Sequence, residues 1–420
     1  MNRAMKDSGI PWIGEIPEGW EVSRHKNIMF KKKDIQEHYS GENIISLTMN
    51  GVVIRDLTAG GKIPLSFDGY QKVQPGNLLL CLFDIDVTPR CVGLIKNDGV
   101  TSPAYSQFVL LKNANAPYFD YLLRYMDDYK CLLHLSKNLR SSLTETDFGM
   151  IPTCLPPLAE QEAIAAFLDR KCGEVDEMVS LQEQVIEELK AYKQSVITEA
   201  VTKGLNPTAP MKPSNIDWIG QIPTHWEKQQ FRRIFIIQKR IAGSLDYDVL
   251  SVTQGGLKVK DLSKNEGQMA QDYSKYQIVG VNDYVMNHMD LITGFVDCSK
   301  QIGVTSPDYR VFHAIDESQI SLSYYLRIFQ TCYKERIFYH LGQGVSGMGR
   351  WRLPAEQLKL FYLPLPPLSE QREIADFLDR KCADIDALIA LKQQKIEDLK
   401  QYKKSLIYEY VTGKKQVFPS

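Results

Sequence analysis

Two long stretches of the sequence carry apolar side chains at every seventh position, apart from one polar residue in each, Gln182 and Lys392. This spacing is typical of a helix that packs along a second helix. The stretches run from Glu160 to Thr202 and from Glu370 to Thr412 without an internal proline, which corresponds to roughly 43 residues, or about 65 Å, of helix. The repeating apolar residues are Leu168, Val175, Leu189 and Val196 in the first stretch, and Leu378, Ile385, Leu399 and Leu406 in the second.

An apolar stripe of this length is too long to be buried inside one small domain. We therefore expect the two helices to pack on each other in antiparallel fashion, with the polar residues weakening the middle of the seam and setting its register. The alternative is that each helix lies across its own domain. Further apolar residues are expected to widen the packed face, namely Met178, Val185, Ile186 and Tyr192 in the first stretch and Leu388, Ile396 and Tyr402 in the second.

The start of each long helix carries the same signals. Pro156 and Pro157 stop the first helix from extending backwards, because a residue that precedes proline is pushed out of the α region. Glu160 then stands in the first turn, where a negative charge suits the positive end of the helix dipole. The same Pro-Pro-Leu-x-Glu sequence begins again at Pro366.

Outside these stretches, shorter patterns predict a mixture of strands and helices. Residues 50–57 and 98–110 alternate apolar and polar positions around turn residues, and the apolar runs at 77–83 and 283–289 predict buried strands. Residues 118–135 and 321–341 have helical spacing instead. Each body is therefore mixed α and β, and at about 140 residues it has the size of a domain.

The sequence contains an internal duplication. "LPPLAEQEAIAAFLDRKC" at 155–172 recurs as "LPPLSEQREIADFLDRKC" at 365–382, and "IPWIGEIPEGWE" at 10–21 recurs as "IDWIGQIPTHWE" at 216–227. The bodies between them share only scattered turns and strands, such as "GVTSP". The openings and helices are thus under one common constraint, whereas the bodies have been free to differ. This favours two readers of different targets on a common frame.

Composition narrows the class of protein only slightly. The formal net charge is -1, which gives no global preference for a polyanionic partner but leaves room for a local basic face. The eight cysteines form no CxxC pair and no Cys/His cluster with the spacing of metal ligands, so we expect no metal site. The sequence has no apolar run of signal-peptide or membrane-spanning length, and we expect a cytoplasmic protein without membrane contact.

The duplicated "LPPLxEQ" with "FLDRKC", the duplicated "WIGxIPxxWE" and the alternation of variable body and long helix resemble the specificity subunits of type I restriction-modification systems. The resemblance covers essentially the whole chain. It implies an α+β (mixed) fold in which two globular target-recognition domains are joined by two long antiparallel coiled-coil-like helices, as a pseudo-twofold internal repeat. The implied segments are 1–154 and 206–364 for the target-recognition domains, and 155–205 and 365–420 for the helices that set the spacer and dock partners.

The resemblance also implies a function. Each domain would read one half of a split sequence in double-stranded DNA, while the helices would fix the length of the unspecified spacer. Two methyltransferase (modification) subunits would dock on the frame, and restriction and translocase subunits would join through the assembled complex. Physical reasoning agrees, because a protein with two equivalent readers meets two half-sites at a separation that its geometry sets.

The chain itself lacks the sequence signals of an enzyme. A DNA adenine methyltransferase needs a glycine-rich cofactor loop and an Asp or Asn before Pro-Pro-aromatic, but "LPPL" offers Leu155 and Leu365 at that position. There is no P-loop motif and no convincing nuclease motif. We therefore expect no cofactor and no catalytic residue, with catalysis in partner subunits.

Basic residues in the two bodies are the candidates for DNA contact, because Arg and Lys bind phosphates and guanine edges, and glycine allows close backbone approach. The repeated tryptophans are interpreted differently: residues kept in both halves cannot read different sequences, so they would anchor each opening segment. The DNA candidates are Lys31, Lys32, Lys33, Arg55, Arg90, Lys137 and Arg140 in the first body, and Arg232, Arg233, Lys239, Arg240, Lys258, Lys260, Gly344, Arg350 and Arg352 in the second.

Two other functions compete with this one. A duplicated structural adaptor would join two protein partners and bind no nucleic acid, so it would lack the steep salt dependence of a duplex binder. A self-contained methyltransferase is disfavoured by the missing cofactor and base-pocket motifs.

Overall fold

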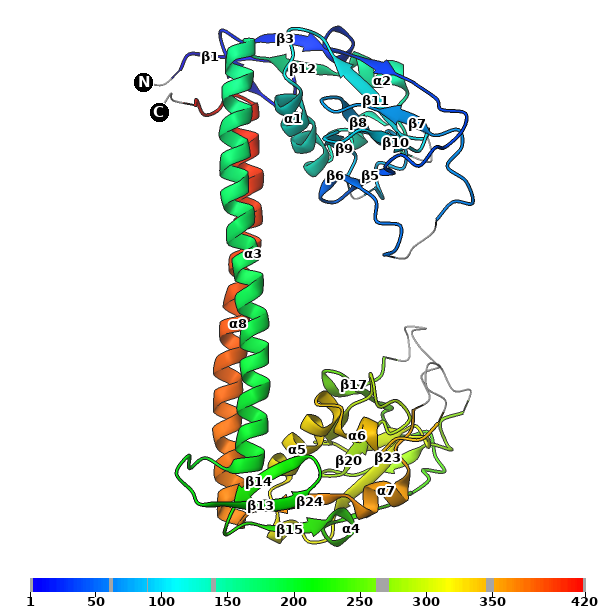
Figure 1. Ribbon diagram of the computed structural model, residues 1–420, viewed down its shortest axis with the longest axis vertical. Helices are drawn as coiled ribbons and strands as arrows, with labels where there is room; N and C mark the ends of the chain where they lie inside the picture. The colour runs from blue at the N-terminus through cyan, green and yellow to red at the C-terminus, as the bar shows by residue number, and fades with distance from the viewer. Residues whose placement is uncertain are drawn as a thin grey trace. The chain divides into compact units, whose positions relative to one another are not determined.

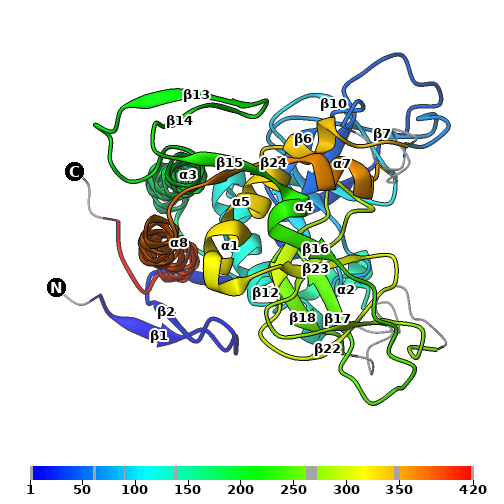
Figure 2. The ribbon, with the colours of Figure 1, turned by 90° about the horizontal axis from the view of Figure 1, so that it is seen from below.

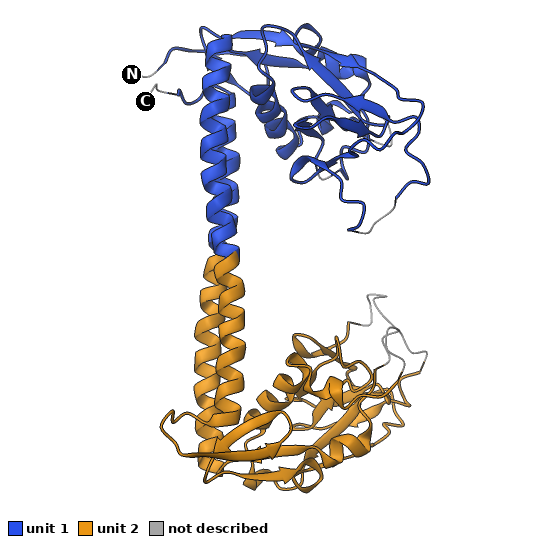
Figure 3. Cartoon of the chain, viewed as in Figure 1, with its two compact units in different colours: residues 1–183, 393–420 blue, residues 184–392 orange. Residues whose placement is uncertain are grey.

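The computed structural model describes residues 3–59, 63–88, 90–136, 141–261, 272–344 and 351–417. The chain divides into two compact units (Figures 1 and 3). Unit 1 comprises residues 1–183 and 393–420, and unit 2 comprises residues 184–392. Each unit holds one body together with half of each of two long helices, α3 (Leu158–Lys203) and α8 (Leu368–Val411).

The body of unit 1 is built from short strands and two short α-helices. The strands are β1 (Met5–Asp7), β2 (Glu15–Pro17), β3 (Glu21–Arg24), β4 (Met29–Lys32), β5 (Ile45–Thr48), β6 (Gly51–Ile54), β7 (Gln71–Val73), β8 (Leu78–Leu80), β9 (Val92–Leu94), β10 (Gly99–Thr101), β11 (Ser106–Leu110) and β12 (Pro152–Leu155). The helices are α1 (Ala116–Asp128) and α2 (Glu145–Met150), with 3-10 turns at His25–Asn27 and Leu133–Leu135.

The body of unit 2 repeats this order. Its strands are β13 (Met211–Ile216), β14 (Ile219–Pro223), β15 (Glu227–Gln230), β16 (Phe235–Ile237), β17 (Leu250–Thr253), β18 (Gly256–Val259), β19 (Gln277–Val279), β20 (Tyr284–Met286), β21 (Val296–Cys298), β22 (Gly303–Thr305), β23 (Arg310–Ala314) and β24 (Tyr362–Leu365). Its helices are α4 (Phe231–Ile234), α5 (Leu322–Lys334), α6 (Ile337–His340) and α7 (Ala355–Leu360), with a 3-10 turn at Glu317–Gln319.

The two bodies have the same sheet topology. Unit 1 contains an antiparallel four-stranded sheet in the order β4-β11-β8-β9, and unit 2 contains β16-β23-β20-β21. Each sheet is flanked by corresponding two-stranded pairs, β3 with β12 and β15 with β24 among them. The predicted mixed α and β bodies and the predicted internal repeat are therefore confirmed.

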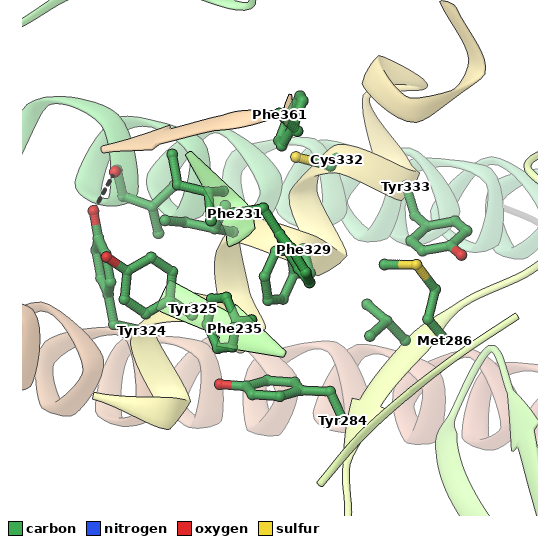
Figure 4. Packing of buried hydrophobic residues seen from close by; sticks show 14 of the residues in the cluster. Phe231, Phe235, Tyr284, Met286, Tyr324, Tyr325, Phe329, Cys332, Tyr333 and Phe361 are labelled. Atoms are coloured by element: carbon green, nitrogen blue, oxygen red, sulfur yellow. Dashed lines mark hydrogen bonds between the residues drawn. The ribbon is translucent and has the colours of Figure 1, made fainter. Parts of the chain in front are cut away.

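Each body has its own apolar core, closed by a helix that packs against the sheet. In unit 1, Tyr118 and Phe119 of α1 are fully buried with Trp20. In unit 2, the rings of Phe235 and Tyr284 lie 5.5 Å apart at their centroids and pack with Phe329 of α5 (Figure 4). Such buried aromatic rings supply much of the apolar area that stabilises a domain.

In each unit the halves of α3 and α8 lie side by side (Figures 1 and 2) and run antiparallel. In unit 1 the start of α3 shares an apolar core with the end of α8, through Leu168 and Leu406, and in unit 2 the end of α3 shares one with the start of α8, through Val201 and Leu378. The helices also pack on the bodies, since α1 and α5 contribute to the same cores.

The predicted ladder lies along this seam. Leu168, Val175, Leu378, Ile385, Leu399 and Leu406 are buried, while Leu189 and Val196 are half-buried. A second ladder is filled by Cys172, Ile186, Cys382 and Ile396, all buried.

The predicted widening of the packed face was largely wrong. Met178, Tyr192, Leu388 and Tyr402 are exposed, by 49%, 49%, 39% and 54% respectively, and Val185 is half-buried. The physical reason is that one partner helix covers only the narrow stripe that faces it, and residues beside that stripe stay in contact with solvent.

Candidate nucleic-acid interface and its frame

The duplicated motifs meet where each body joins the long helices. In unit 1 the indole Nε1 of Trp20 donates to Oε2 of Glu160 at 2.9 Å, and in unit 2 Trp226 donates in the same way to Glu370 at 3.0 Å. Both tryptophans are fully buried. The prediction that they anchor the opening segments is confirmed, and neither ring is accessible for stacking on a base.

A glutamine beside each glutamate ties the body to the helix pair. Oε1 of Gln161 accepts from the backbone N–H of Asn115 at 2.8 Å, and Oε1 of Gln371 accepts from that of Ser321 at 2.9 Å. Asn115 and Ser321 are the N-caps of α1 and α5. A side chain that bonds to these backbone groups at the N-caps helps to fix the orientation of the capped helix.

The hydroxyls of two tyrosines complete this frame. Tyr118 on α1 donates to the carbonyl oxygen of Val411 at 2.9 Å, and Tyr324 on α5 donates to that of Val201 at 2.9 Å. Both acceptors lie at the ends of long helices, where backbone carbonyls lack a partner within the helix. The tryptophan, glutamate, glutamine and tyrosine contacts together form the frame of each unit.

The shared "GVTSP" motif also serves a structural role inside each body. The buried amide of Gln71 donates to the carbonyl oxygen of Ser102 at 3.0 Å, and Gln277 donates to that of Ser306 at 2.7 Å. The motif therefore holds a turn against the neighbouring strand pair in both bodies.

The candidate basic residues of unit 1 fall into different surroundings. On β4, Lys31 lies 3.5 Å from a Glu145 carboxylate oxygen, and Lys32 donates to Oε1 of Gln74 at 3.0 Å. Lys33 is exposed, and Arg55 is half-buried. Lys31, Lys32 and Lys33 are thus the candidates that unit 1 brings together on one edge of its sheet.

Two of the candidate arginines are held by buried carboxylates. Nη1 of Arg90 lies 2.9 Å from Asp128 and 3.5 Å from Asp127, and Arg240 is paired with Asp283. Asp127 and Asp283 are buried. These contacts neutralise the two arginines locally, so both have a clear structural role.

The candidates of unit 2 do not form one patch. Arg232 and Arg233 lie on α4, at the opposite end of the body from the β17–β18 hairpin that carries Lys258 and Lys260 (Figure 1). Arg232, Arg233, Lys239, Lys258, Gly344 and Arg352 are exposed, and Lys260 is half-buried. The candidates Lys137, Arg140 and Arg350 lie outside the described residues.

Each unit also exposes an apolar patch on its part of the helix pair. Patch 1 consists of Met178, Leu181 and Tyr402 in unit 1, and patch 2 consists of Leu388, Leu391 and Tyr192 in unit 2. In each patch the tyrosine comes from one long helix and the other two residues from its partner helix. The ion pairs Lys403–Asp176 and Lys193–Asp386, both with N–O distances below 3 Å, join the two helices beside the patches. The sequence carries a signal for these patches, because the same apolar positions recur in both helices beside the ladder.

Within the described ranges there is no group of three or more His, Cys, Asp or Glu side chains placed to hold a metal ion. Among those same residues, no helix has the length and apolar character that a membrane crossing requires.

The chain is thus a duplicated protein in which one set of frame contacts, made twice, carries two bodies of one topology. A family model described as type I restriction modification DNA specificity domain matches residues 237–401. The putative type I restriction enzyme MjaX specificity subunit of Methanocaldococcus jannaschii is 24% identical over 96% of this chain and 96% of its own length. The type I restriction enzyme EcoBI specificity subunit of Escherichia coli is 25% identical over 56% of this chain and 52% of its own.

Two solved structures share the fold. One is a chain from a structure that describes complex assembly and conformational transition of the type I R-M system, with a TM-score of 0.68, 14% identity and coverage of 94% of this chain and 98% of that chain. The other is the HsdS subunit from Thermoanaerobacter tengcongensis, with a TM-score of 0.50, 14% identity and coverage of 95% and 98%. Together these findings confirm the predicted resemblance to type I specificity subunits and give no support to the adaptor alternative.

Proposed function

We propose that this chain is the non-catalytic DNA-specificity subunit of a type I restriction-modification system and recognises a bipartite sequence with an unspecified spacer. The observation that carries the proposal is the contrast between identical frames and different bodies. Trp20 with Glu160 and Trp226 with Glu370 make one contact twice, whereas the exposed residues of the bodies differ. A protein built in this way presents two different surfaces to two half-sites.

The target-recognition domains of the proposal are residues 1–154 and 206–364, and residues 155–205 and 365–420 form the spacer helices. Exposed basic residues of each body make the phosphate contacts that position it on the duplex, Lys33 and Lys258 among them. Because the substrate is DNA, the proposal places the assembly in the cytoplasm.

Methylation and cleavage are carried out by partner subunits in this proposal. Patch 1 and patch 2 support two copies of one methyltransferase subunit, because Met178, Leu181 and Tyr402 are matched by Leu388, Leu391 and Tyr192 in an equivalent setting. Two copies of the same partner require two equivalent surfaces. Restriction and translocase subunits join through this modification assembly.

Mapping of methylated positions tests the proposal. The chain is expressed with its modification subunits in a host free of methylation, and the methylated sites in the genome are aligned. We expect a split consensus of two short specific elements separated by a constant number of unspecified bases. A continuous consensus, or none, would contradict the proposal.

Duplex binding as a function of salt separates the proposal from a protein adaptor. A specificity subunit that neutralises several phosphates loses affinity steeply as salt rises. A protein adaptor binds no duplex at any salt concentration. Absence of duplex binding would therefore favour the structural adaptor over the specificity subunit.

A further inference from the structure

Unit 2 has an open cavity where α3 ends, beside the frame of that unit. Its volume is about 480 Å³, which is within the range of cavities that bind ligands. Val196 and Ala200 of α3 and Phe377 of α8 form one wall. The connector after α3 and Met211 of β13 form the other, where the β13–β14 hairpin lies beside the end of α3 (Figure 1). The wall that the long helices supply is therefore apolar.

In unit 1 the equivalent position is occupied by an aromatic ring of the chain itself. The duplication of 155–172 at 365–382, continued along both helices, aligns Ala200 with Tyr410 and Phe377 with Phe167. The rings of Phe167 and Tyr410 pack with their centroids 4.4 Å apart. In unit 2 an alanine stands in place of the tyrosine, and Phe377 lines the cavity instead.

A second exchange, one turn earlier, affects the same face of the helix. Leu406 is 5% exposed, whereas its counterpart Val196 is half-buried and lines the cavity. Residues four positions apart lie on one face of a helix, so the exchanges at 196 and 200 act together. The cavity lies where valine and alanine take the places of leucine and tyrosine.

The connector after α3 is held in place by its own contacts. Oδ1 of Asn206 accepts from the backbone N–H of Thr208 at 3.0 Å and from the Thr208 hydroxyl at 2.8 Å. At Gly204, where φ is +76°, an added Cβ would lie 2.8 Å from Oε1 of Glu370 and 3.2 Å from the ring of Trp226. The connector therefore packs directly on the frame of unit 2 and forms a fixed wall, so the cavity is preformed.

The cavity is continuous with patch 2. Tyr192 of that patch lies one turn before Val196 on the same face of α3. Lys381, one turn after Phe377 on α8, lies over the ring of Tyr192, with Nζ 5.7 Å from the ring centroid. The exposed surface of patch 2 therefore leads along the helix pair into the cavity.

We propose that this cavity receives an aromatic side chain of the methyltransferase subunit that docks on patch 2. Unit 1 shows the chemistry of the occupant, because Tyr410 packs on Phe167 at the equivalent place. Two copies of one subunit carry the same side chain, which enters the cavity on unit 2 and meets the ring of Tyr410 on unit 1. The two docking sites are therefore unequal, and unit 2 holds its subunit more tightly.

The inference rests on the proposed function, and its test measures the two docking sites of the full chain separately. Leu181→Glu blocks patch 1 and leaves the site of unit 2, whereas Leu391→Glu blocks patch 2 and leaves the site of unit 1. Each chain is titrated with the methyltransferase subunit. We expect the site of unit 2 to bind about 10- to 150-fold more tightly, which is the effect of burying one aromatic side chain.

Exchange of the residues that differ between the units should exchange the affinities. In the Leu181→Glu chain, Ala200→Tyr fills the cavity as unit 1 does and should lower the affinity to that of unit 1. Ala200→Ser leaves the cavity open and serves as the matched control, with unchanged affinity. In the Leu391→Glu chain, Tyr410→Ala opens the equivalent space and should strengthen binding. Hydrogen exchange of α3 and α8 reports whether each variant is folded.

Replacement of exposed aromatic residues of the methyltransferase subunit by alanine identifies the occupant without altering unit 2. One such replacement should weaken binding to the unaltered cavity by the same 10- to 150-fold, or about the full difference between the sites. It should have no further effect on a chain that carries Ala200→Tyr, because both changes remove the same contact.

Three results would overturn the assignment of the cavity. One is equal affinity of the two docking sites, and another is unchanged affinity in a folded Ala200→Tyr variant. The third is that no aromatic residue of the methyltransferase subunit affects binding to unit 2. In each case the unaltered complex would still methylate a split sequence, so the proposed function would stand. If the complex methylated no split sequence at all, the proposed function itself would fail, and the role of the cavity with it.

Discussion

Units 1 and 2 make the same contacts where the body meets the long helices and different contacts inside the body. At the junction, Tyr118 and Tyr324 reach the ends of α8 and α3 with the same 2.9 Å hydrogen bond. Under the sheet, unit 1 uses neutral amides, with Asn77 donating to Gln107 at 2.9 Å, whereas unit 2 pairs Asp283 with Arg240. This contrast is the one that the proposed function requires, with a junction common to both units and a separate surface on each body.

The strongest test of the shared junction removes its tryptophans. Trp20→Ala and Trp226→Ala should each destabilise their own unit by about 3–5 kcal/mol, because both rings are fully buried and the indole N–H of each is bonded to a glutamate. Hydrogen exchange resolved by unit is the measurement, since a chain of two units need not unfold in one step. A large effect in one unit and none in the other would show that the two junctions are not equivalent.

Acid should destabilise unit 1 through His25, whose place at the end of β3 is taken by Phe231 in unit 2. Burial lowers the pKa of His25 to about 4, against a weaker opposing contribution from the backbone of Phe148. The pKa of His25 is lower in the folded chain than the unfolded value of about 6.5. The neutral His25 side chain therefore makes its full contribution to the stability of unit 1 above about pH 6.5. This contribution is lost as pH falls towards 4, and amounts to about 3 kcal/mol.

The control for this pH effect is His25→Phe, which gives unit 1 the aromatic residue of unit 2. The stability of unit 1, followed by denaturant unfolding between pH 7 and pH 4, should then lose this part of its pH dependence. The stability of unit 2 should still depend on pH in this variant, through His288, whose pKa is also about 4. An unchanged pH profile of unit 1 in the variant would show that His25 does not titrate in this way.

The two apolar patches should each hold one methyltransferase subunit. Leu181 and Leu391 are 51% and 65% exposed, so replacing either by Glu should leave the chain folded. Burying a leucine against a partner contributes about 2 kcal/mol, and its loss should weaken one of two binding events by roughly 30-fold.

Native mass spectrometry of the assembled complex counts the bound subunits. Leu181→Glu and Leu391→Glu should each reduce the complex from two methyltransferase subunits to one, and the double variant should bind none. Glu187→Gln, at an exposed position outside both patches, serves as the matched control. Loss of both subunits in either single variant would contradict two independent docking surfaces.

The smallest effect is expected from the ion pairs of the helix pair. Lys193–Asp386 and Lys403–Asp176 have N–O distances of 2.6 and 2.7 Å, but the carboxylates are about 60% exposed. Exposed pairs contribute little, so Asp176→Asn and Asp386→Asn should each change the free energy of unfolding by less than about 1 kcal/mol. Small and equal shifts of the denaturant midpoint in the two variants would support the equivalence of the units. A large shift in one variant alone would contradict it.

The long helices and the frame could be predicted from the sequence because their signals are local and occur twice. The proline pair, the first-turn glutamate and the seven-residue ladder gave α3 and α8 to within a few residues of their observed ends. The exposure of Tyr192 and Tyr402 cannot be predicted in this way, because a helical period identifies an apolar side without showing how much of it a partner covers.

The interior of the bodies was less predictable. Their central strands are only three to five residues long, and each pairs with strands far away in the sequence, so local patterns do not define the sheet order. Arg310 illustrates this limit. In the sequence it is an isolated arginine after a turn, and only the pairing of β23 with β20 and the bond to Leu353 bring it beside His288 and Arg352.

The most direct test of two readers joined by the long helices lengthens the connection at the end of α3. One helical turn inserted between Thr202 and Pro207 extends the helix by about 5.4 Å, comparable to one or two base pairs of B-DNA. Methylated sites are then mapped for the insertion variant and the unaltered chain, each assembled with the same modification subunits. We expect the number of unspecified bases between the half-sites to change while the bases read in each half stay the same. An unaltered spacer, or altered half-site bases, would contradict the claim that the long helices set the separation of two independent readers.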